Sequence, residues 1–239
     1  MEAVISTQAQ SRPAERRLPG PVTNPPIPEI VAELSGNHGG KMSNALRLIS
    51  EAKGAGADAV KFQCFEPEAL ASKRVGITWH GQRMDYANLL SLYQKTHTPK
   101  GWFPLMIARC KYLGIEWLAS AFSPDDVAFL ETMGCPRYKI SAYEMLDGDL
   151  INAVVATGKP IIMSVRPTER VTILEATDYD GKLAPLGLSD HSASIYYRGK
   201  DQNRTMIERH IMLPDVPCED DAFSLSPAEF ARYVEMVRP

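Results

Sequence analysis

The sequence predicts an α/β protein, a (β/α)8 TIM barrel with some outer helices shortened or missing. Short apolar runs of strand length alternate with stretches whose apolar residues recur at helical spacing, and eight such strands can be counted. With 239 residues, of which 44% are hydrophobic and 23% charged, the chain suits one barrel domain with a large core. Eight repeated βα units favour a closed barrel over an open doubly wound sheet.

Residues 1–27 differ from this pattern. They hold several prolines and arginines and show no apolar periodicity. We expect a flexible Pro/Arg-rich N-terminal arm. A basic arm can bind phosphates, but a solvated tail is the simpler interpretation. Residues 28–239 then form the barrel domain.

The first half of the barrel domain follows the repeat. Strands are predicted at residues 30–35, 59–65, 115–122 and 138–142, and helices at 45–52, 103–113, 127–133 and 150–155. Each helical stripe is followed by a glycine, the residue that commonly closes a helix. A long excursion separates the second strand from its helix.

The second half departs from the repeat. Strands are predicted at 160–165, 171–177, 186–190 and 206–212, and a capping box that begins at Ser226 opens the last helix. Between the fifth and sixth strands, and between the sixth and seventh, there are too few residues for a parallel crossover, which takes about a dozen. We therefore expect outer helices to be missing there. Strand faces left bare would be covered by the arm or by another subunit, so we predict a homodimer.

The composition excludes several function classes. A net charge of -3 gives no basic footprint for nucleic acid. No apolar run reaches the roughly 18 residues that a membrane helix needs. The four cysteines show no C-x-x-C spacing, and no secretory leader or lipidation motif is recognisable. We expect a cytoplasmic protein with reduced thiols and with neither a nucleic-acid nor a membrane partner.

Polar residues within apolar strands are the main functional signal, because a buried charge is costly unless it is paired. Near the carboxyl ends of barrel strands such residues converge on one mouth. His191 and His210 each close a strand, and two imidazoles there can hold a divalent metal ion. Lys61 and Lys139 indicate an anionic substrate. Any one of these side chains could instead be a structural partner in the barrel interior.

Five segments resemble, in order, the motifs of the sialic acid synthase family: residues 31–38, 56–63, 138–144, 187–191 and 207–210. That family condenses phosphoenolpyruvate with an N-acetylated amino sugar at the mouth of a TIM barrel, using Mn²⁺ or Mg²⁺. The resemblance therefore implies a phosphoenolpyruvate-dependent nonulosonic acid synthase, a transferase of sialic acid biosynthesis.

The resemblance also implies roles for the metal and phosphoenolpyruvate residues. His191 and His210 resemble the metal ligands, and the metal would polarise the sugar aldehyde. Lys61 and Lys139 would hold the phosphate and carboxylate of phosphoenolpyruvate. Three serine hydroxyls would assist them: Ser120, Ser164 and Ser189.

A second group of residues would act on the sugar and on the attacking water. Glu33, Gln63 and Glu144 match family positions with this role, and either glutamate could be the general acid or base. Thr177 and Tyr179 fall where the family has a sugar-facing segment. These assignments, too, follow from the resemblance.

One acidic residue has two possible matches. The family has such a residue just before a Phe-Ser-Leu element. Counting back from Phe223 gives Asp220, and counting forward from His210 gives Asp221. We favour Asp220 as a catalytic residue.

The pseudaminic acid branch of the family is the most similar in motifs. Tyr143, before Glu144, resembles an aromatic residue of that branch, as do aromatic and Thr-Pro elements of the excursion after the second strand. These aromatics could instead simply pack the excursion. The acceptor implied is a diacetamido-trideoxyhexose.

The chain also departs from the family. The 239 residues hold no counterpart of its C-terminal antifreeze-like domain, and the family's Ser-Thr-Gly after the fifth strand is Ser164-Val165-Arg166. One alternative is therefore a non-catalytic relative that binds metal or ligand through a trimmed barrel. Another is condensation with a phosphorylated sugar, as in octulosonate and heptulosonate synthases. The absence of an extra Arg/Lys cluster in the sequence counts against that second alternative.

Overall fold

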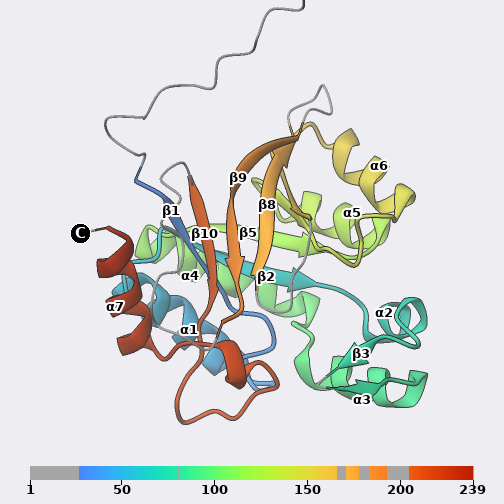
Figure 1. The fold of residues 1–239 in the computed structure, drawn as a ribbon, viewed down its shortest axis with the longest axis horizontal. Helices are drawn as coiled ribbons and strands as arrows, with labels where there is room; N and C mark the ends of the chain where they lie inside the picture. Colours follow the sequence, from blue (N-terminus) through green and yellow to red (C-terminus); the bar gives the residue numbers. More distant parts are fainter. Residues whose placement is uncertain (1–26, 80, 166–170, 178–182, 193–204, 239) are drawn as a thin grey trace, which may run out of the picture.

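The computed structural model describes residues 27–79, 81–165, 171–177, 183–192 and 205–238. The barrel strands are β1 (Glu29–Glu33), β2 (Ala59–Cys64), β5 (Glu116–Ala121), β6 (Tyr138–Ile140), β7 (Ile161–Val165), β8 (Val171–Thr177), β9 (Leu183–Asp190) and β10 (Met206–His210). They close into a barrel in the order β1-β10-β9-β8-β7-β6-β5-β2 (Figure 1). The predicted α/β barrel is thereby confirmed. Of the predicted arm, residues 1–26 lie outside the described part of the chain.

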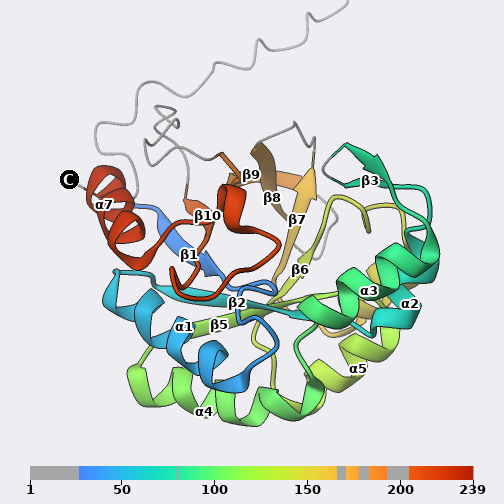
Figure 2. The same ribbon diagram turned by 90° about the horizontal axis from the view of Figure 1, so that it is seen from below.

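The helices are α1 (Met42–Gly54), α2 (Pro67–Lys73), α3 (Tyr86–Thr96), α4 (Phe103–Leu113), α5 (Pro124–Thr132), α6 (Gly148–Ala156) and α7 (Pro227–Val237). Two short strands, β3 (Thr78–Trp79) and β4 (Gln82–Arg83), and two 3-10 turns, η1 (Lys100–Trp102) and η2 (Asp221–Phe223), lie in the connections. Helices α1, α4 and α5 form a row outside β2 and β5 (Figure 2). Among the described residues, no helix is long and apolar enough to cross a membrane.

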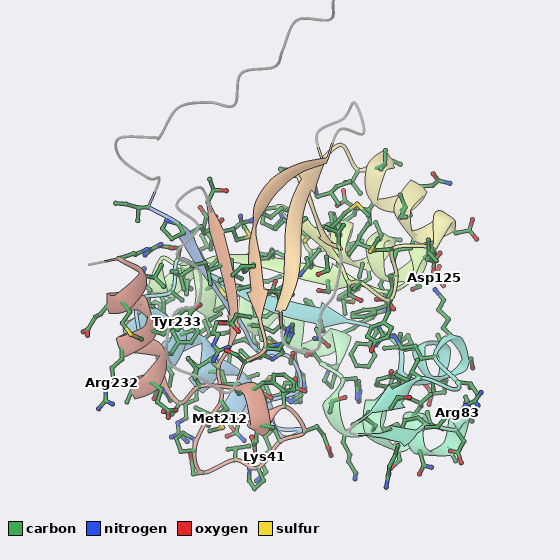
Figure 3. The ribbon with its side chains drawn as sticks, in the orientation of Figure 1. Lys41, Arg83, Asp125, Met212, Arg232 and Tyr233 are labelled. Atoms are coloured by element: carbon green, nitrogen blue, oxygen red, sulfur yellow. The ribbon has the colours of Figure 1, made fainter. Side chains whose placement is uncertain are left out.

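Local sequence explains where the helices begin. Ser123 caps α5 by accepting a hydrogen bond from the Asp126 amide, and the predicted capping box of α7 joins Ser226 and Glu229 reciprocally. The buried face of α7 carries Tyr233, which points toward the sheet, whereas Arg232 points away from it (Figure 3). Period-3.6 patterning therefore orients this helix on the barrel.

Strand β8 is the exception to the parallel arrangement that repeated βα units imply. It pairs antiparallel with both β7 and β9. Only residues 166–170 and 178–182 separate it from these neighbours. A parallel crossover takes about a dozen residues, so the chain can only return beside the preceding strand. In the described part of the chain no helix lies between β7 and β10. This agrees with the prediction that outer helices are missing there.

The barrel interior has an apolar floor with a polar layer above it. Five inward side chains form one hydrophobic cluster, the floor: Val31, Ala59, Leu118, Ile162 and Met206. Side chains of a strand alternate between its two faces, so a residue two positions further along points the same way. Those positions hold five buried polar residues: Glu33, Lys61, Ser120, Ser164 and Glu208. The floor thus supports the polar layer at the carboxyl ends of the parallel strands.

Candidate active site

A cavity of about 500 Å³ opens above the polar layer. It is lined by most of the predicted site residues: Glu33, Lys61, Gln63, Ser120, Lys139, Ser164, Ser189, His191, His210 and Asp220. The ends of strands far apart in the sequence bring these side chains together. Such a concave site with several convergent polar groups is typical of ligand binding.

Two buried lysines share one buried carboxylate at the bottom of the cavity. The Nζ atom of Lys61 lies 2.6 Å from Glu208 Oε2 and 3.0 Å from Glu33 Oε2. The Nζ atom of Lys139 lies 3.1 Å from the same Glu208 Oε2. Ser189 donates its hydroxyl hydrogen bond to Glu208 Oε1 at 2.7 Å. This lysine–carboxylate centre therefore holds two cations against Glu208 and Glu33.

Burial and pairing act in opposite directions on these groups. Burial lowers the pKa of Lys61, but Glu208 and Glu33 outweigh it, and the pKa ends above its ordinary value. Burial lowers the pKa of Lys139 to about 8; Glu208 opposes this shift and Lys61 adds to it. Burial raises the pKa of Glu208, but Lys139 and Lys61 hold it well below the ordinary value. Lys139 is thus the cation of the centre that loses its proton most easily.

Glu208 is not among the predicted site residues, although the sequence contained a signal for it. It stands two positions before His210 on β10, and both side chains face the cavity. Arg209, between them, faces outward: its Nη1 lies 3.0 Å from Asp190 Oδ1, and its guanidinium lies over the Tyr233 ring at 5.3 Å. The period of two along a strand therefore predicts Glu208 from His210.

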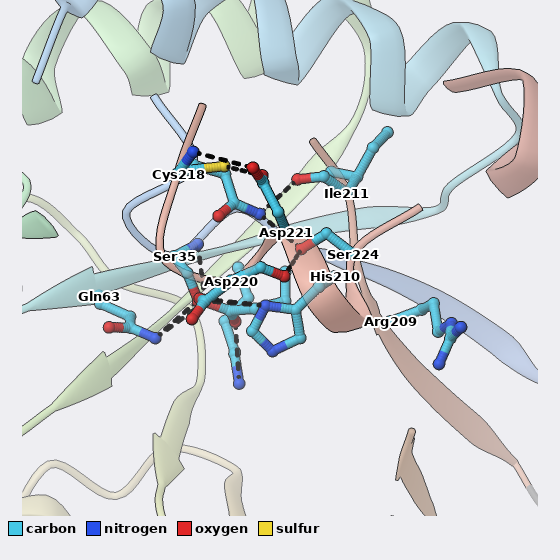
Figure 4. A network of polar contacts seen from close by, with 12 residues as sticks. Ser35, Gln63, Arg209, His210, Ile211, Cys218, Asp220, Asp221 and Ser224 are labelled. Carbon is cyan, nitrogen blue, oxygen red and sulfur yellow. Dashed lines mark hydrogen bonds and ion pairs between the residues drawn. The ribbon is translucent and has the colours of Figure 1, made fainter. Parts of the chain in front are cut away.

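The two predicted metal ligands form a pair. The ring centroids of His191 and His210 are 4.9 Å apart, and Phe223 packs against both rings. The Nδ1 atom of His210 lies 3.4 Å from Ser35 Oγ and 3.5 Å from Asp220 Oδ2 (Figure 4). Metal-binding histidines commonly form a hydrogen bond through one ring nitrogen. This hydrogen bond orients the other ring nitrogen toward the ion.

The chemistry of this pair fits a divalent ion. Burial, and then the neighbouring His210, lower the pKa of His191 to about 3, so its imidazole is neutral and has a lone pair to donate. No group of three or more His, Cys, Asp or Glu that could hold a metal occurs among the described residues. His191 and His210 would supply two nitrogen ligands to such an ion, which would supply Lewis-acid chemistry at this end of the cavity.

Asp220, rather than Asp221, lies at the cavity. Burial would raise the pKa of Asp220, yet its contacts with His210 and Ser35 keep it below the ordinary value. Asp221 instead accepts hydrogen bonds from the amide and thiol of Cys218. Figure 4 shows Asp220 beside the His210 ring and Asp221 turned toward Cys218. The geometry therefore favours Asp220 of the two sequence matches.

Glu33 is held by a network of its own. Its Oε1 accepts hydrogen bonds from the Ser35 amide at 2.9 Å, the Ser35 hydroxyl at 2.7 Å and the Gln63 amide nitrogen at 3.1 Å. Ser35, not predicted as a site residue, has a φ of 42°. Left-handed backbone is uncommon for a residue with a side chain and is found most often where geometry serves a site. The network fixes Glu33 beside Lys61, and Ser35 links it to His210.

Three predicted residues are not seen to line the cavity. Glu144 is buried behind Arg74, which lines the cavity and donates to Glu144 Oε1 from Nε at 3.1 Å and from Nη2 at 2.5 Å. Thr177 pairs with Ile161 at the start of β7, at the end of the barrel away from the cavity. The reversed direction of β8 therefore removes Thr177 from the place where we expected it. Tyr179 lies outside the described residues.

The fold and the cavity define a class: an α/β-barrel protein whose strand ends present buried lysines, carboxylates and a histidine pair to one ligand site. The chain belongs to the NeuB family, whose model matches residues 48–179. It is 30% identical over 250 residues to pseudaminic acid synthase of Helicobacter pylori, covering 88% of this chain and 74% of that one. It is 29% identical to pseudaminic acid synthase of Campylobacter jejuni, covering 87% and 72%. The resemblance to the sialic acid synthase family is thereby confirmed.

Solved structures agree on the fold. N-acetylneuraminic acid synthetase from Leptospira borgpetersenii, in complex with citrate, matches with a TM-score of 0.70 and 21% identity, covering 89% of this chain and 82% of that one. A spore coat polysaccharide biosynthesis protein from Bacillus subtilis matches with a TM-score of 0.67 and 23% identity, covering 89% and 67%. At these identities the likeness concerns the barrel alone. The sequence comparisons make the chain a homologue of nonulosonic acid synthases.

Proposed function

We propose that this protein condenses phosphoenolpyruvate with an N-acetylated amino-sugar aldehyde to give a nonulosonic acid and phosphate. The observation that carries the proposal is the placement of the lysine–carboxylate centre and the histidine pair on one cavity. Membership of the NeuB family supports the same reaction class.

The reaction needs an anion site beside an electrophile site. C3 of phosphoenolpyruvate forms a bond to the aldehyde carbon, and the aldehyde oxygen takes up the π electron pair and a proton. Water adds to C2 and gives up its protons as the bond from C2 to the phosphate oxygen breaks, which leaves a ketone and phosphate. Lys61 and Lys139 would hold the phosphate and carboxylate, with the hydroxyls of three lining serines: Ser120, Ser164 and Ser189. Glu33, held by Ser35 and Gln63, would take a proton from the attacking water.

His191 and His210 would hold the divalent ion. When bound, the ion supplies Lewis-acid polarisation of the sugar carbonyl. Asp220 orients His210 through Nδ1, so its role in this proposal is to position that ring. Glu144 accepts a hydrogen bond from Arg74, which lines the cavity. In this proposal Arg74 would contact the sugar, and Glu144 would hold Arg74 in place.

We propose a pseudaminic-type acid as the product. Both relatives described above are named pseudaminic acid synthases. Tyr143 lines the cavity, and its ring lies 4.8 Å from the Arg74 guanidinium carbon. The corresponding acceptor is a diacetamido-trideoxyhexose.

Phosphate release is the test. Purified protein would be incubated with Mn²⁺, phosphoenolpyruvate and a panel of amino-sugar aldehydes, with and without a chelator. We expect phosphate release that needs both the metal and an acylated amino sugar, and loss of release in His210→Ala. His97→Ala, a histidine outside the cavity lining, is the matched control and should keep full activity. Equal release by both variants would contradict the assignment.

A non-catalytic relative is the second candidate, favoured by the reversed β8 that moves Thr177 away from the cavity. It predicts no phosphate release with any sugar, while phosphoenolpyruvate and Mn²⁺ still bind by calorimetry. The two candidates therefore differ in one measurement.

A further inference from the structure

The connection from β10 to α7 forms part of the histidine end of the cavity. We define this connection by residues 211–225 and call it the mouth loop. Asp220 and Phe223 of the mouth loop line the cavity, and Phe223 packs against the rings of His191 and His210. Asp220 Oδ2 lies 3.5 Å from His210 Nδ1. The position of the mouth loop therefore affects how both rings are held.

The two ends of the mouth loop are joined to each other and to one side chain. The Met212 amide donates a hydrogen bond to the Leu225 carbonyl at 2.9 Å. Asn37, in the connection after β1, donates from Nδ2 to the Ile211 carbonyl at 2.8 Å and to Ser224 Oγ at 3.0 Å. Ile211 directly follows β10, whereas Ser224 lies near the start of α7 (Figure 4). One amide group thus holds both ends of the loop.

A further hydrogen bond carries this contact to the residue beside His210. Ser224 Oγ accepts the hydrogen bond from Asn37 and donates one to the Asp220 carbonyl oxygen at 2.8 Å. The Asp220 carboxylate in turn contacts His210 Nδ1. Asn37 is therefore connected to His210 through Ser224 and Asp220, although it does not line the cavity itself.

The side chain of Asn37 is used for its two donor hydrogens. It is fully buried, and in the part of the chain that the structure describes its Oδ1 atom has no hydrogen-bond partner. Burying an unpaired amide oxygen is costly, so an amide would be a poor choice for packing alone. The two hydrogen bonds from Nδ2 give a reason for an amide at this position.

The backbone next to Asn37 also touches the mouth loop. Gly39 has a φ of 56°, and a Cβ atom there would lie 2.7 Å from Val216 Cγ1 of the loop. A residue with a side chain would strain the backbone and push the loop away, so glycine permits this close approach. The hydrogen bonds of Asn37 therefore act on a loop that already packs against the same segment.

We propose that Asn37 is a positioning residue for the histidine pair. It fixes the mouth loop, and the loop holds Asp220 and Phe223 against His210 and His191. Removing a group that orients a metal-binding histidine commonly weakens metal binding by about ten- to a hundredfold. This inference rests on the proposed function, because it takes the two histidines as ligands of the divalent ion.

Two separate affinities test the proposal. Mn²⁺ and phosphoenolpyruvate would each be titrated alone into the full chain and into Asn37→Leu, which keeps the branched shape of the side chain and removes both donors. We expect Mn²⁺ to bind about tenfold more weakly or worse. Phosphoenolpyruvate binding should stay within about twofold, because Lys61, Lys139 and Glu208 hold one another. If both affinities fell equally, or if the Mn²⁺ affinity of the folded variant were unchanged, the proposal would be overturned.

Asn44 provides the matched control. Its Nδ2 donates to the His38 carbonyl at 3.0 Å, so this asparagine of α1 holds the same segment as Asn37 through a different hydrogen bond. Asn44→Leu should keep the wild-type affinity for Mn²⁺. If it weakened Mn²⁺ binding as much as Asn37→Leu does, the effect would come from the segment in general, and the proposal would be wrong.

Ser224→Ala tests the link between Asn37 and Asp220, and it decides the question if Asn37→Leu does not fold. The change removes the hydroxyl that joins these two residues. We expect Mn²⁺ affinity to fall about threefold or more. Adding Asn37→Leu should have less than its separate effect, because both changes act on one chain of hydrogen bonds. An unchanged Mn²⁺ affinity in Ser224→Ala would refute the positioning role.

The proposal and the proposed function can fail separately. Weaker Mn²⁺ binding by Asn37→Leu, in a protein whose wild type releases no phosphate with any amino sugar, would uphold the positioning role and contradict the synthase. Mn²⁺-dependent phosphate release with equal Mn²⁺ affinities of wild type and Asn37→Leu would uphold the synthase and overturn the positioning role. A wild type that binds no Mn²⁺ would contradict both.

Discussion

At the residue scale, Glu208 supplies the negative charge that both buried lysines of the cavity contact. Two fully buried lysines without a counter-ion would be costly, and Glu208 contacts both of them. Glu33 contacts Lys61 as well, but Glu208 is the carboxylate that both lysines share. A bound phosphate would enter a site whose cations are already ordered, which lowers the cost of binding.

Glu208→Gln tests this role. The change keeps the size of the side chain and removes its charge, so we expect the free energy of unfolding to fall by about 3–5 kcal/mol in denaturant titrations. Phosphoenolpyruvate supplies negative charge, so it should raise the melting temperature of the variant more than that of the wild type. Glu116→Gln is the control, because this side chain is 77% exposed and its pairing with Arg137 should contribute under about 1 kcal/mol. An unchanged stability of Glu208→Gln would contradict the argument.

Lys139 gives the site a pH dependence. Since burial and Lys61 lower its pKa to about 8, we expect the affinity for phosphoenolpyruvate to fall as pH rises through that value. Well above it, the fall approaches about tenfold per pH unit if binding needs the protonated lysine. Calorimetry across this range measures it, and Lys139→Arg, which stays protonated, should flatten the profile.

As pH rises, the contribution of Lys139 to the free energy of unfolding should increase, whereas the affinity for phosphoenolpyruvate should fall. The pKa of Lys139 is about 8 in the folded chain and near its ordinary value of 10.5 in the unfolded chain. Between these values the unfolded chain binds more protons at this lysine, so the contribution of Lys139 to stability rises with pH.

The affinity for phosphoenolpyruvate is the other measurement in this pH range. If that affinity stayed constant, the proton on Lys139 would not matter for binding.

At the scale of elements, strand alternation made much of the polar layer predictable. Glu33 and Lys61 stand two positions after the floor residues Val31 and Ala59, and the same period marks Glu208. The direction of β8 could not come from its pattern, because alternation is the same in either direction. The short connections on both sides of β8 carried that information.

The sequence did not predict contacts between side chains that lie far apart along the chain. Arg74 and Glu144 are 70 residues apart, and nothing near either one indicates the other. The sequence therefore identified Glu144 without the arginine that separates it from the cavity. Tyr93 and Phe122 were likewise visible as apolar residues, but only the packing of α2 and α3 against the strand ends makes them a cavity wall.

Gly187 allows β9 and β10 to lie close together, and these two strands position the histidine pair. A Cβ atom there would lie on the carbonyl oxygen of Met206, the residue that Gly187 faces on β10. Gly187→Ala must push β9 away from β10, the strands that carry His191 and His210 into the site. We expect a loss of about 3 kcal/mol in unfolding free energy and weaker Mn²⁺ binding.

Gly148→Ala is the matched control for Gly187→Ala. Gly148 begins α6, and a Cβ there meets nothing within 4 Å. The change should be neutral or stabilising by up to about 1 kcal/mol. Equal Mn²⁺ affinity for both variants would show that the spacing of β9 and β10 does not set the metal site.

At the scale of the whole molecule, the helices in the described part of the chain cover the barrel unevenly. Helices α1, α4 and α7 pack beside one another along β1, β2 and β5, whereas no helix in the described part of the chain covers β8 and β9 (Figures 1 and 2). Outer strand faces in a barrel of this kind are normally buried. We therefore propose that the β8 and β9 side of the barrel is covered by a second copy of the chain in a homodimer.

Hydrogen exchange at several protein concentrations tests the dimer together with the fold. In dilute protein, amides of β8 should open with a free energy about 2 kcal/mol or more below that of β2, because covered strands open only with the whole domain. As the concentration rises, protection should increase in β8 and β9 and stay constant in β2, while light scattering reports the mass of two chains. Protection in β8 equal to that in β2 at every concentration, with the mass of a single chain throughout, would contradict the dimer. That result would mean that residues of the same chain cover this side of the barrel, and the long-lived protection of β8 would then be a property of the monomer.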